Sequence, residues 1–247
     1  GQGLPIAQTR TGFLIVACWW LLMSIPTAVY VKQVHHQPVP RSPIKDSFLR
    51  LGKTLRNIRH YRQVFYFLIA YFFYIDGVGT VISMSTAYGR DLGFGVNQLI
   101  MVLLFIQVIA FPCALVYGRL AVRFSPKSMI MTGIFIYCLI TLAAFSLPSI
   151  TDPAVKTSLF WIIAFLVASS MGGIQALSRS YFGKLIPSDK SGEFFGFYNV
   201  FGKFAAIGGP FIMGLVTSIT GESRWGILSL LFLFVAGAWF LSKVEAS

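Results

Sequence analysis

The chain has 247 residues, of which 56% are hydrophobic and only 11% are charged. A soluble domain carries about 25% charged residues, so this composition excludes a soluble globular protein and indicates an integral membrane protein. The formal net charge of +12 would suit a nucleic-acid-binding protein, but the positions of the cations along the chain point to membrane topology instead.

Seven apolar windows are long enough to cross a membrane. A hydrocarbon core of about 30 Å needs about 20 helical residues, and lipid offers no hydrogen-bond partner to an open strand, so each window predicts an α-helix. The windows cover roughly 11–31, 64–87, 97–117, 128–147, 159–180, 194–219 and 225–242. The predicted fold class is therefore an all-α integral membrane protein.

A polar stretch separates the first window from the other six. We expect residues 1–31 to hold one transmembrane helix, residues 32–63 a basic linker and residues 64–247 a six-helix domain. The start lacks Met and the features of a signal peptide, which favours a fragment of a longer protein.

The linker predicts an amphipathic helix over about 46–60. Asp46 or Ser47 can cap its N-terminus. Apolar residues then recur at helical spacing, opposite a basic face: Phe48, Leu51, Leu55 and Ile58 against Arg50, Lys53 and Arg56. Such a helix would lie on the membrane surface with its cations toward anionic lipid. A solvated connector is the alternative.

The cations indicate which side of the membrane each connection faces. If the windows simply alternate, 15 of the 20 Lys and Arg lie on one side and four on the other, with Lys203 inside a window. The positive-inside rule then places residues 32–63 and the C-terminus in the cytoplasm. In a bacterium, the membrane would be the cytoplasmic membrane.

Asp76 lies in the middle of the second window, far from either headgroup region. A charge there costs about 3 kcal/mol, and intramembrane acids mark functional sites by default. At about 100° per residue, Phe72, Asp76, Thr80 and Ser83 form one stripe, which we expect to face protein or water. We interpret Asp76 and Thr80 as substrate- or proton-binding residues.

Two glutamines lie at a similar depth in other windows. Gln107 is near the middle of the third window, and Gln175 lies in the fifth window on the same face as Arg179. Both amides can orient a solute, or they can form structural hydrogen bonds between helices, worth about 1 kcal/mol each. Arg179 lies near the inner end of its helix, where a long basic side chain can reach the interface.

The sixth window carries Asn199 and Lys203 on a face of small residues, which allow close helix packing or a cavity. We expect the opposite face to turn phenylalanines toward lipid: Phe194, Phe197, Phe201 and Phe204. At about 1.5 Å per residue, Asp76 and Lys203 lie at comparable depths, so an ion pair between them is one hypothesis. The alternative is that Lys203 extends to the interface and Asp76 stays protonated.

Metal and enzyme chemistry are not indicated. The three cysteines lie inside apolar windows without disulfide or metal spacing, and the three histidines lie in the linker. No HExxH pattern, Ser/His/Asp arrangement or phosphate loop occurs in the sequence. We therefore expect no catalytic residue, metal or cofactor.

The stretch Gly118-Arg119-Leu120-Ala121-Val122-Arg123-Phe124-Ser125-Pro126-Lys127 resembles the G-x-L-A-D-R-x-G-R-K loop of the major facilitator superfamily. Within it, Gly118, Arg119, Arg123 and Lys127 form the expected structural loop motif. Val122 replaces the Asp of the pattern, and Ser125-Pro126 replaces Gly-Arg.

Further segments resemble the vacuole-effluxer-like branch of that superfamily. They are Asp76-Gly77-Val78, residues 172–180 (GGIQALSRS), residues 185–187 (LIP), residues 193–196 (EFFG) and residues 208–210 (GGP). The resemblance implies the sixth helix, central loop and C-terminal six helices of a twelve-helix transporter, with two inverted three-helix repeats. Fungal members of the branch are associated with amino-acid efflux from the vacuole.

From residues and resemblance together, we expect secondary active transport, by alternating access, of a small polar or zwitterionic metabolite. Asp76 would bind a proton or an amine, Asn199 and Lys203 a carboxylate, and Gln107 and Gln175 would orient the solute. Partners would be the solute, a coupling ion, lipid, and a missing N-terminal half or a second copy. The alternative is a membrane interaction or lipid-handling domain without solute coupling.

Overall fold

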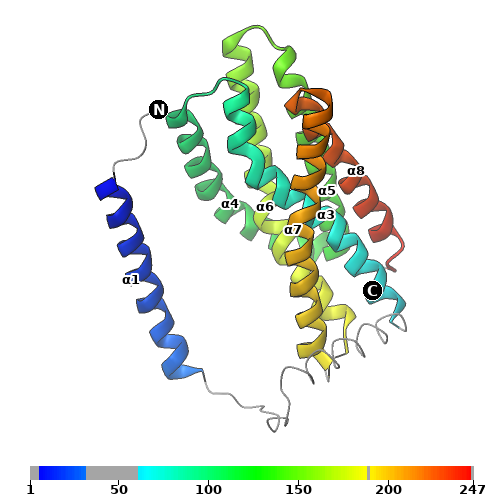
Figure 1. The fold of residues 1–247 in the computed structure, drawn as a ribbon. Helices are drawn as coiled ribbons and strands as arrows, with labels where there is room; N and C mark the ends of the chain where they lie inside the picture. Colours follow the sequence, from blue (N-terminus) through cyan, green and yellow to red (C-terminus); the bar gives the residue numbers. More distant parts are fainter. Residues whose placement is uncertain (1–5, 32–60, 188–189, 246–247) are drawn as a thin grey trace. The chain divides into compact units, whose positions relative to one another are not determined.

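The computed structural model describes residues 6–31, 61–187 and 190–245. Its elements are α1 (Ile6–Tyr30), α3 (Arg62–Asp91), α4 (Val96–Phe124), α5 (Pro126–Ser146), the 3-10 turn η1 (Leu147–Ser149), α6 (Pro153–Leu185), α7 (Ser191–Thr220) and α8 (Ser223–Ser242) (Figure 1). Seven helices within these ranges are long and apolar enough to cross a membrane. The predicted all-α membrane fold is confirmed.

The chain divides into two compact units, residues 1–47 and 48–247. Helix α1 belongs to the first unit, and its apolar side chains are exposed, as suits a helix that lies in lipid. The amphipathic helix predicted over about 46–60 lies outside the described residues.

The second unit is a six-helix bundle in which the first three helices pack on the last three (Figure 1). Helix α3 contacts α7 and α8, helix α6 contacts α4 and α5, and α5 contacts α8. The first helix of each triplet therefore packs on the second and third helices of the other, as expected for two inverted repeats. The second helices, α4 and α7, are the least buried of the six.

The bundle has an aromatic core near the start of α3. Phe67 stacks on Phe182 with ring centroids 5.8 Å apart, and Tyr71 stacks on Tyr198 at 4.2 Å. Tyr74 is fully buried and shares a 2.7 Å hydrogen bond with the Ser178 hydroxyl. These contacts join α3, α6 and α7, and they supply a buried hydrogen bond as well as apolar area.

Two of the phenylalanines that were expected to face lipid are buried instead. Phe194 is 1% exposed and Phe197 is 6% exposed, whereas Phe204 is 63% exposed. Phe194 meets Tyr61 edge to face, with centroids 5.4 Å apart. The prediction was wrong for Phe194 and Phe197 because the first turns of α7 are part of the aromatic core, whereas Phe204 is on the exposed surface of the bundle.

The stretch expected to form a loop over residues 118–127 is mostly helix. Residues 118–124 are the last turns of α4, and Ser125 alone joins α4 to α5. Ser125 has φ 74° and ψ 145°, a conformation that is essentially restricted to glycine. The superfamily motif has Gly at this position, so the departure at Ser125 introduces backbone strain.

The last residue of the same motif has a structural contact. The Lys127 ammonium donates to the backbone carbonyl groups of Ser242, at 3.3 Å, and Val244. The Glu245 N–H in turn donates to Oε1 of Gln63 at 2.8 Å. A cation at the C-terminal end of a helix satisfies unpaired carbonyl groups and interacts favourably with the helix dipole, so Lys127 fixes the end of α8 to the start of α5.

Replacing Ser125 with glycine is expected to raise the free energy of unfolding by about 1 kcal/mol, because the strain of a positive φ is relieved. The gain is reduced by a few tenths of a kcal/mol, since the Ser125 hydroxyl accepts the Ser128 N–H at 3.3 Å. Ser125→Ala keeps the strain, loses this cap and should be less stable than the wild type. Thermal unfolding in detergent tests both, and a glycine variant no more stable than wild type would contradict the expectation.

Candidate functional site

A hollow of about 410 Å³ lies between α3, α6 and α7, and we call it the polar hollow. Its polar lining consists of Gln175 and Arg179 on α6, Asn199 and Tyr198 on α7, and Tyr71 on α3. The structure therefore brings the predicted residues Gln175 and Asn199 together. It also adds Arg179, which the sequence suggested only as a helix-end residue.

Helical spacing explains how these side chains reach the polar hollow. Gln175 and Arg179 lie one turn apart on the same face of α6, and both are exposed. On α7, Gly202 follows Asn199 by about one turn, and a Cβ at Gly202 would come within 2.9 Å of the Tyr71 hydroxyl. A larger residue at position 202 would therefore displace Tyr71.

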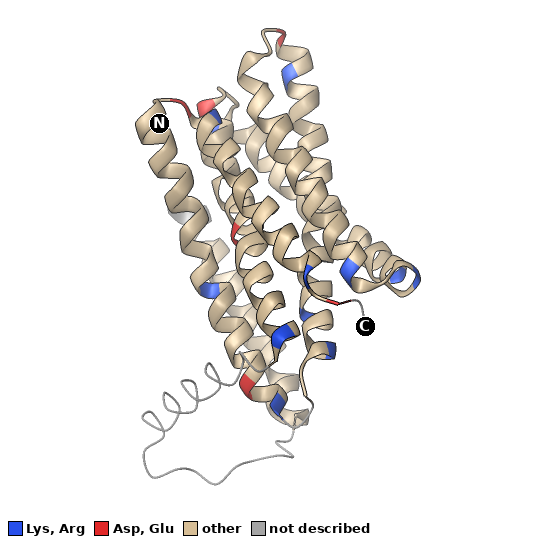
Figure 2. Cartoon of the chain, turned by 90° about the vertical axis from the view of Figure 1, so that its right-hand side faces the viewer, with Lys and Arg blue, Asp and Glu red and all other residues tan. Residues whose placement is uncertain are grey.

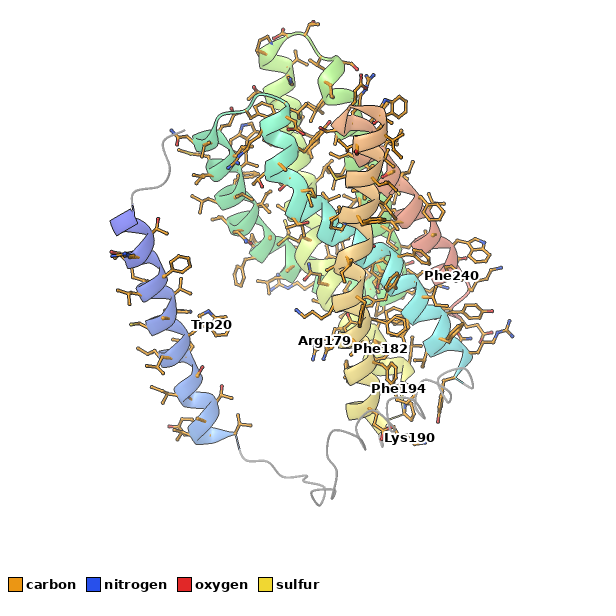
Figure 3. The ribbon with its side chains drawn as sticks, viewed as in Figure 1. Trp20, Arg179, Phe182, Lys190, Phe194 and Phe240 are labelled. Carbon is orange, nitrogen blue, oxygen red and sulfur yellow. The ribbon has the colours of Figure 1, made fainter. Side chains whose placement is uncertain are left out.

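Arg179 gives the polar hollow its charge. It is the only Lys, Arg, Asp or Glu among the ten lining residues, all of which the structure describes. Its guanidinium carbon lies 5.3 Å from the ring centroid of Phe195, within cation–π distance. The side chain projects outward, whereas Phe182 lies inside the bundle (Figure 3). The polar hollow thus offers a fixed cation, two amides and two phenols to an anionic group.

Asp76 does not line the polar hollow but bridges α3 to α7. It is 1% exposed, and its Oδ1 accepts the backbone N–H of Gly209 at 2.8 Å. Pro210 follows directly and has no N–H, so the backbone hydrogen bonding of α7 is already interrupted at this turn. Thr80, also 1% exposed, donates to the Asp76 carbonyl oxygen at 2.7 Å. Asp76 and Thr80 therefore face protein, as the stripe on this helix predicted.

Glycines on α7 permit this contact. A Cβ on Gly208 would lie 2.6 Å from Asp76 Oδ2, and one on Gly209 would lie 2.0 Å from the Thr80 hydroxyl oxygen. The two helices can therefore approach this closely only where α7 has no side chains. Sequence reasoning identified Gly208-Gly209-Pro210 as a family motif but did not recognise it as the partner of Asp76.

The hypothesis of an ion pair between Asp76 and Lys203 is wrong for this conformation. Lys203 is exposed and Asp76 is buried, and the ion pair found among the described residues joins Arg224 to Glu222. Helices α3 and α7 do pack together, but Asp76 lies on the face of α3 that contacts the α7 backbone. Lys203 lies one turn from Asn199 on the exposed face of α7 and is not a lining residue of the polar hollow.

Thr80 and Gln107 line a second cavity, of about 120 Å³, which we call the apolar cavity. Gln107 is exposed and is not a lining residue of the polar hollow. The predicted site is therefore divided among the polar hollow, the Asp76–Gly209 contact and the apolar cavity. Across the ranges that the structure describes, no group of three His, Cys, Asp or Glu residues could hold a metal ion.

The chain matches the family described as "Vacuole effluxer Atg22 like" over residues 6–247. It is 48% identical over 238 residues to the uncharacterized MFS-type transporter YxiO of Bacillus subtilis, a match that covers 96% of this chain and 54% of that protein. It is 26% identical over 258 residues to autophagy-related protein 22 of Coccidioides immitis, covering 96% of this chain and 43% of that protein. The chain thus spans about half the length of these relatives. No solved structure matches it.

Proposed function

The chain belongs to the vacuole effluxer Atg22-like family of the major facilitator superfamily, and we propose that it forms the C-terminal half of a secondary transporter. Residues 1–31 would be the sixth helix of the whole protein, residues 32–63 the central linker and residues 64–247 the C-terminal six-helix domain. The length of the match and the packing of two helix triplets support this division. The relatives are transporters rather than enzymes, and this chain is a multi-pass membrane protein.

The observation that carries the proposed site is the polar hollow with its single cation. A carboxylate can accept charge-assisted hydrogen bonds from the Arg179 guanidinium, while Gln175 and Asn199 offer amide donors and acceptors beside it. The solute would be a small polar or zwitterionic metabolite that carries a carboxylate, moved by alternating access. An amino acid satisfies this description, and the family description "vacuole effluxer" favours efflux as the direction.

Asp76 would couple an ion to this movement. Asp76 is a buried acid that joins α3 to α7 through one charge-assisted hydrogen bond, which its carboxylate accepts from the Gly209 N–H. Protonation of Asp76 would weaken this hydrogen bond and would therefore favour a different arrangement of α3 and α7. Lys203 and Asn199, which lie on the exposed face of α7, would contact the solute or the other half.

The cations of the bundle support the proposed orientation. Lys and Arg gather toward the end where α3 begins and α8 ends (Figure 2), so the positive-inside rule makes that end cytoplasmic. The least buried helices, α4 and α7, would meet the N-terminal half or, in its absence, a second copy of the chain. Lipid would cover the remaining surface.

Arg179→Gln in the full-length protein is expected to lower kcat/KM for a carboxylate solute about 10- to 100-fold, because a charged hydrogen bond contributes about 1.5–3 kcal/mol. Uptake and efflux of a metabolite panel by reconstituted protein measure the effect. Arg179→Lys should retain part of the activity. Arg90→Gln is the matched control, since Arg90 is exposed in the last turn of α3 and is not a lining residue of the polar hollow.

Unchanged transport by Arg179→Gln would exclude this site for the solute. The alternative function, lipid handling, depends on the basic residues 50, 53 and 56, which lie outside the described residues. It makes a different prediction: charge reversal at those three positions would abolish activity, and neutralising Asp76 would have no effect.

A further inference from the structure

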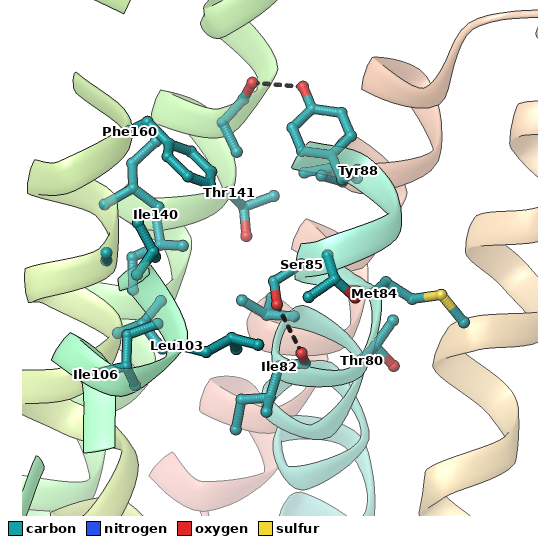
Figure 4. A pocket seen from close by; sticks show the side chains of 18 of the residues that line it. Thr80, Ile82, Met84, Ser85, Tyr88, Leu103, Ile106, Ile140, Thr141 and Phe160 are labelled. Carbon is teal, nitrogen blue, oxygen red and sulfur yellow. Dashed lines mark hydrogen bonds between the residues drawn. The ribbon is translucent and has the colours of Figure 1, made fainter. Parts of the chain in front are cut away.

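The apolar cavity is enclosed mainly by aliphatic side chains from α3, α4, α5, α6 and α8 (Figure 4). Leu103 and Ile106 of α4, Ile140 of α5 and Val167 of α6 form much of its wall. None of the residues that line the polar hollow lines this cavity. It is therefore a separate candidate site, to which the proposed transport mechanism assigns no role.

Four of the five hydroxyl side chains on the wall are already paired with the backbone. Each of the four donates to a carbonyl oxygen: Thr80 to Asp76 at 2.7 Å, Ser85 to Ile82 at 2.8 Å, Tyr88 to Ala144 at 2.8 Å and Thr141 to Tyr137 at 2.8 Å. Figure 4 draws the hydrogen bonds of Ser85 and Tyr88. An internal water needs two to four polar partners, and these hydroxyl protons are not available to it. The interior is therefore suited to hydrocarbon rather than to water or to a polar solute.

The size of the apolar cavity limits its occupant. An engineered cavity of roughly 150 Å³ lined by similar side chains stays dry and binds benzene or xenon, and this one measures about 120 Å³. In a bilayer, transfer from lipid contributes little to binding, so the gain comes from close packing of the occupant against the wall. A compact group fills such a space better than a segment of a long flexible chain.

The route into the apolar cavity lies between α3 and α4, which have few contacts with each other. Leu103 and Gln107 line the cavity and are also exposed, so they mark its mouth on α4. We propose that the apolar cavity binds a compact hydrocarbon group of about six carbon atoms, the apolar end of an amphiphile whose polar group lies at the Gln107 amide. The amphiphile would be a water-soluble solute or a membrane lipid.

Photolabelling of the full-length protein in lipid nanodiscs with a short alkyl diazirine tests this proposal. Ile140 and Leu230 line the cavity and are 1% and 0% exposed, so a probe that labels them must have entered it. Phe135 of α5, a helix that is not proposed to meet the N-terminal half, is 62% exposed and reports labelling from the lipid alone. We expect all three residues to be labelled in the wild type.

Ala164→Leu puts three more carbon atoms into the apolar cavity and should reduce labelling of Ile140 and Leu230 at least fivefold, leaving the labelling of Phe135 unchanged. Val167→Ile is a milder filling variant in case Ala164→Leu does not fold. Ala176→Leu is the matched control on the same helix, because Ala176 lines the polar hollow instead. It should leave the labelling of Ile140 and Leu230 as it is.

Competition identifies the source of the hydrocarbon group. Displacement of the probe by norleucine would support a water-soluble amphiphile, and displacement by a phospholipid with six-carbon acyl chains would support a lipid. Absence of label on Ile140 and Leu230, or equal labelling in the wild type and both filling variants, would overturn the proposal. Labelling is measured without transport, so either result is independent of the function proposed for the polar hollow.

Discussion

Gly209→Ala is expected to lower the free energy of unfolding of the bundle by about 1–3 kcal/mol, the usual cost of overpacking a tight contact. A Cβ at this position would lie 2.0 Å from the Thr80 hydroxyl oxygen and 2.8 Å from Asp76 Oδ1. Thr80 can move only by giving up its bond to the Asp76 carbonyl. The methyl group therefore separates α3 from α7 or breaks a buried hydrogen bond.

The matched control is Gly214→Ala on the same helix, where nothing lies within 4 Å of an added Cβ. It should be neutral or stabilising by up to about 1 kcal/mol, because alanine has the higher helix propensity. Adding Thr80→Ala to Gly209→Ala removes the nearest clash and should recover part of the loss. Thermal unfolding in detergent compares the variants. Equal melting temperatures of Gly209→Ala and Gly214→Ala would show that α3 and α7 are not held in close contact at Gly209.

The helices of this fold could be predicted from the sequence because lipid imposes a strong and simple constraint. Length, hydropathy and charge fix where each span lies, since every backbone group must be bonded within its own helix. The same constraint says little about rotation around the helix axis. Phe194 and Phe204 are equally apolar, yet one is buried and the other exposed, because both the core and the lipid accept phenylalanine.

The partner of Asp76 could not be predicted by matching charges. Depth along a helix is available from residue counting, which made Lys203 a reasonable candidate, but depth does not give the direction of a side chain. The actual partner is the backbone N–H of Gly209, and every residue except proline has such a group. The signal that was available was the glycine pair before Pro210, which indicates a close approach of another helix.

The residues that line the polar hollow could also be predicted only in part from the sequence. Gln175 and Asn199 were predicted because amides are rare in apolar spans, whereas Tyr71 and Tyr198 are too common in membrane helices to be selected. Arg179 was assigned to the helix end, and only its position opposite Asn199 across the gap between α6 and α7 makes it part of a site.

Asp76→Asn is expected to abolish the proton dependence of transport in the full-length protein while leaving its folding nearly intact. Asparagine has the same shape as aspartate, and its Oδ1 can still accept the Gly209 N–H, which lies 2.8 Å from the acid in the wild type. It cannot bind or release a proton in the physiological range. Transport at two external pH values, together with thermal unfolding, separates the coupling role from the structural one.

Asp76→Leu is the structural comparison for this experiment. It leaves the Gly209 N–H buried without its partner, which should cost about 1–3 kcal/mol of stability. Loss of transport in Asp76→Leu alone, with normal pH dependence in Asp76→Asn, would mean that Asp76 only holds α3 to α7. Loss of pH dependence in the stable Asp76→Asn variant would instead identify Asp76 as the coupling residue.

A double-mutant cycle of Asp76→Asn and Lys203→Gln tests whether Asp76 and Lys203 form an ion pair in any conformation. In the structure Asp76 is buried against Gly209, whereas Lys203 is exposed, so the two changes should add within about 0.5 kcal/mol in unfolding free energy. When transport activity is measured instead of stability, the same double-mutant cycle also reports on the other conformations that the transporter adopts. Additivity in stability combined with strong non-additivity in transport would place the ion pair in a conformation other than this one, and additivity in both would exclude it.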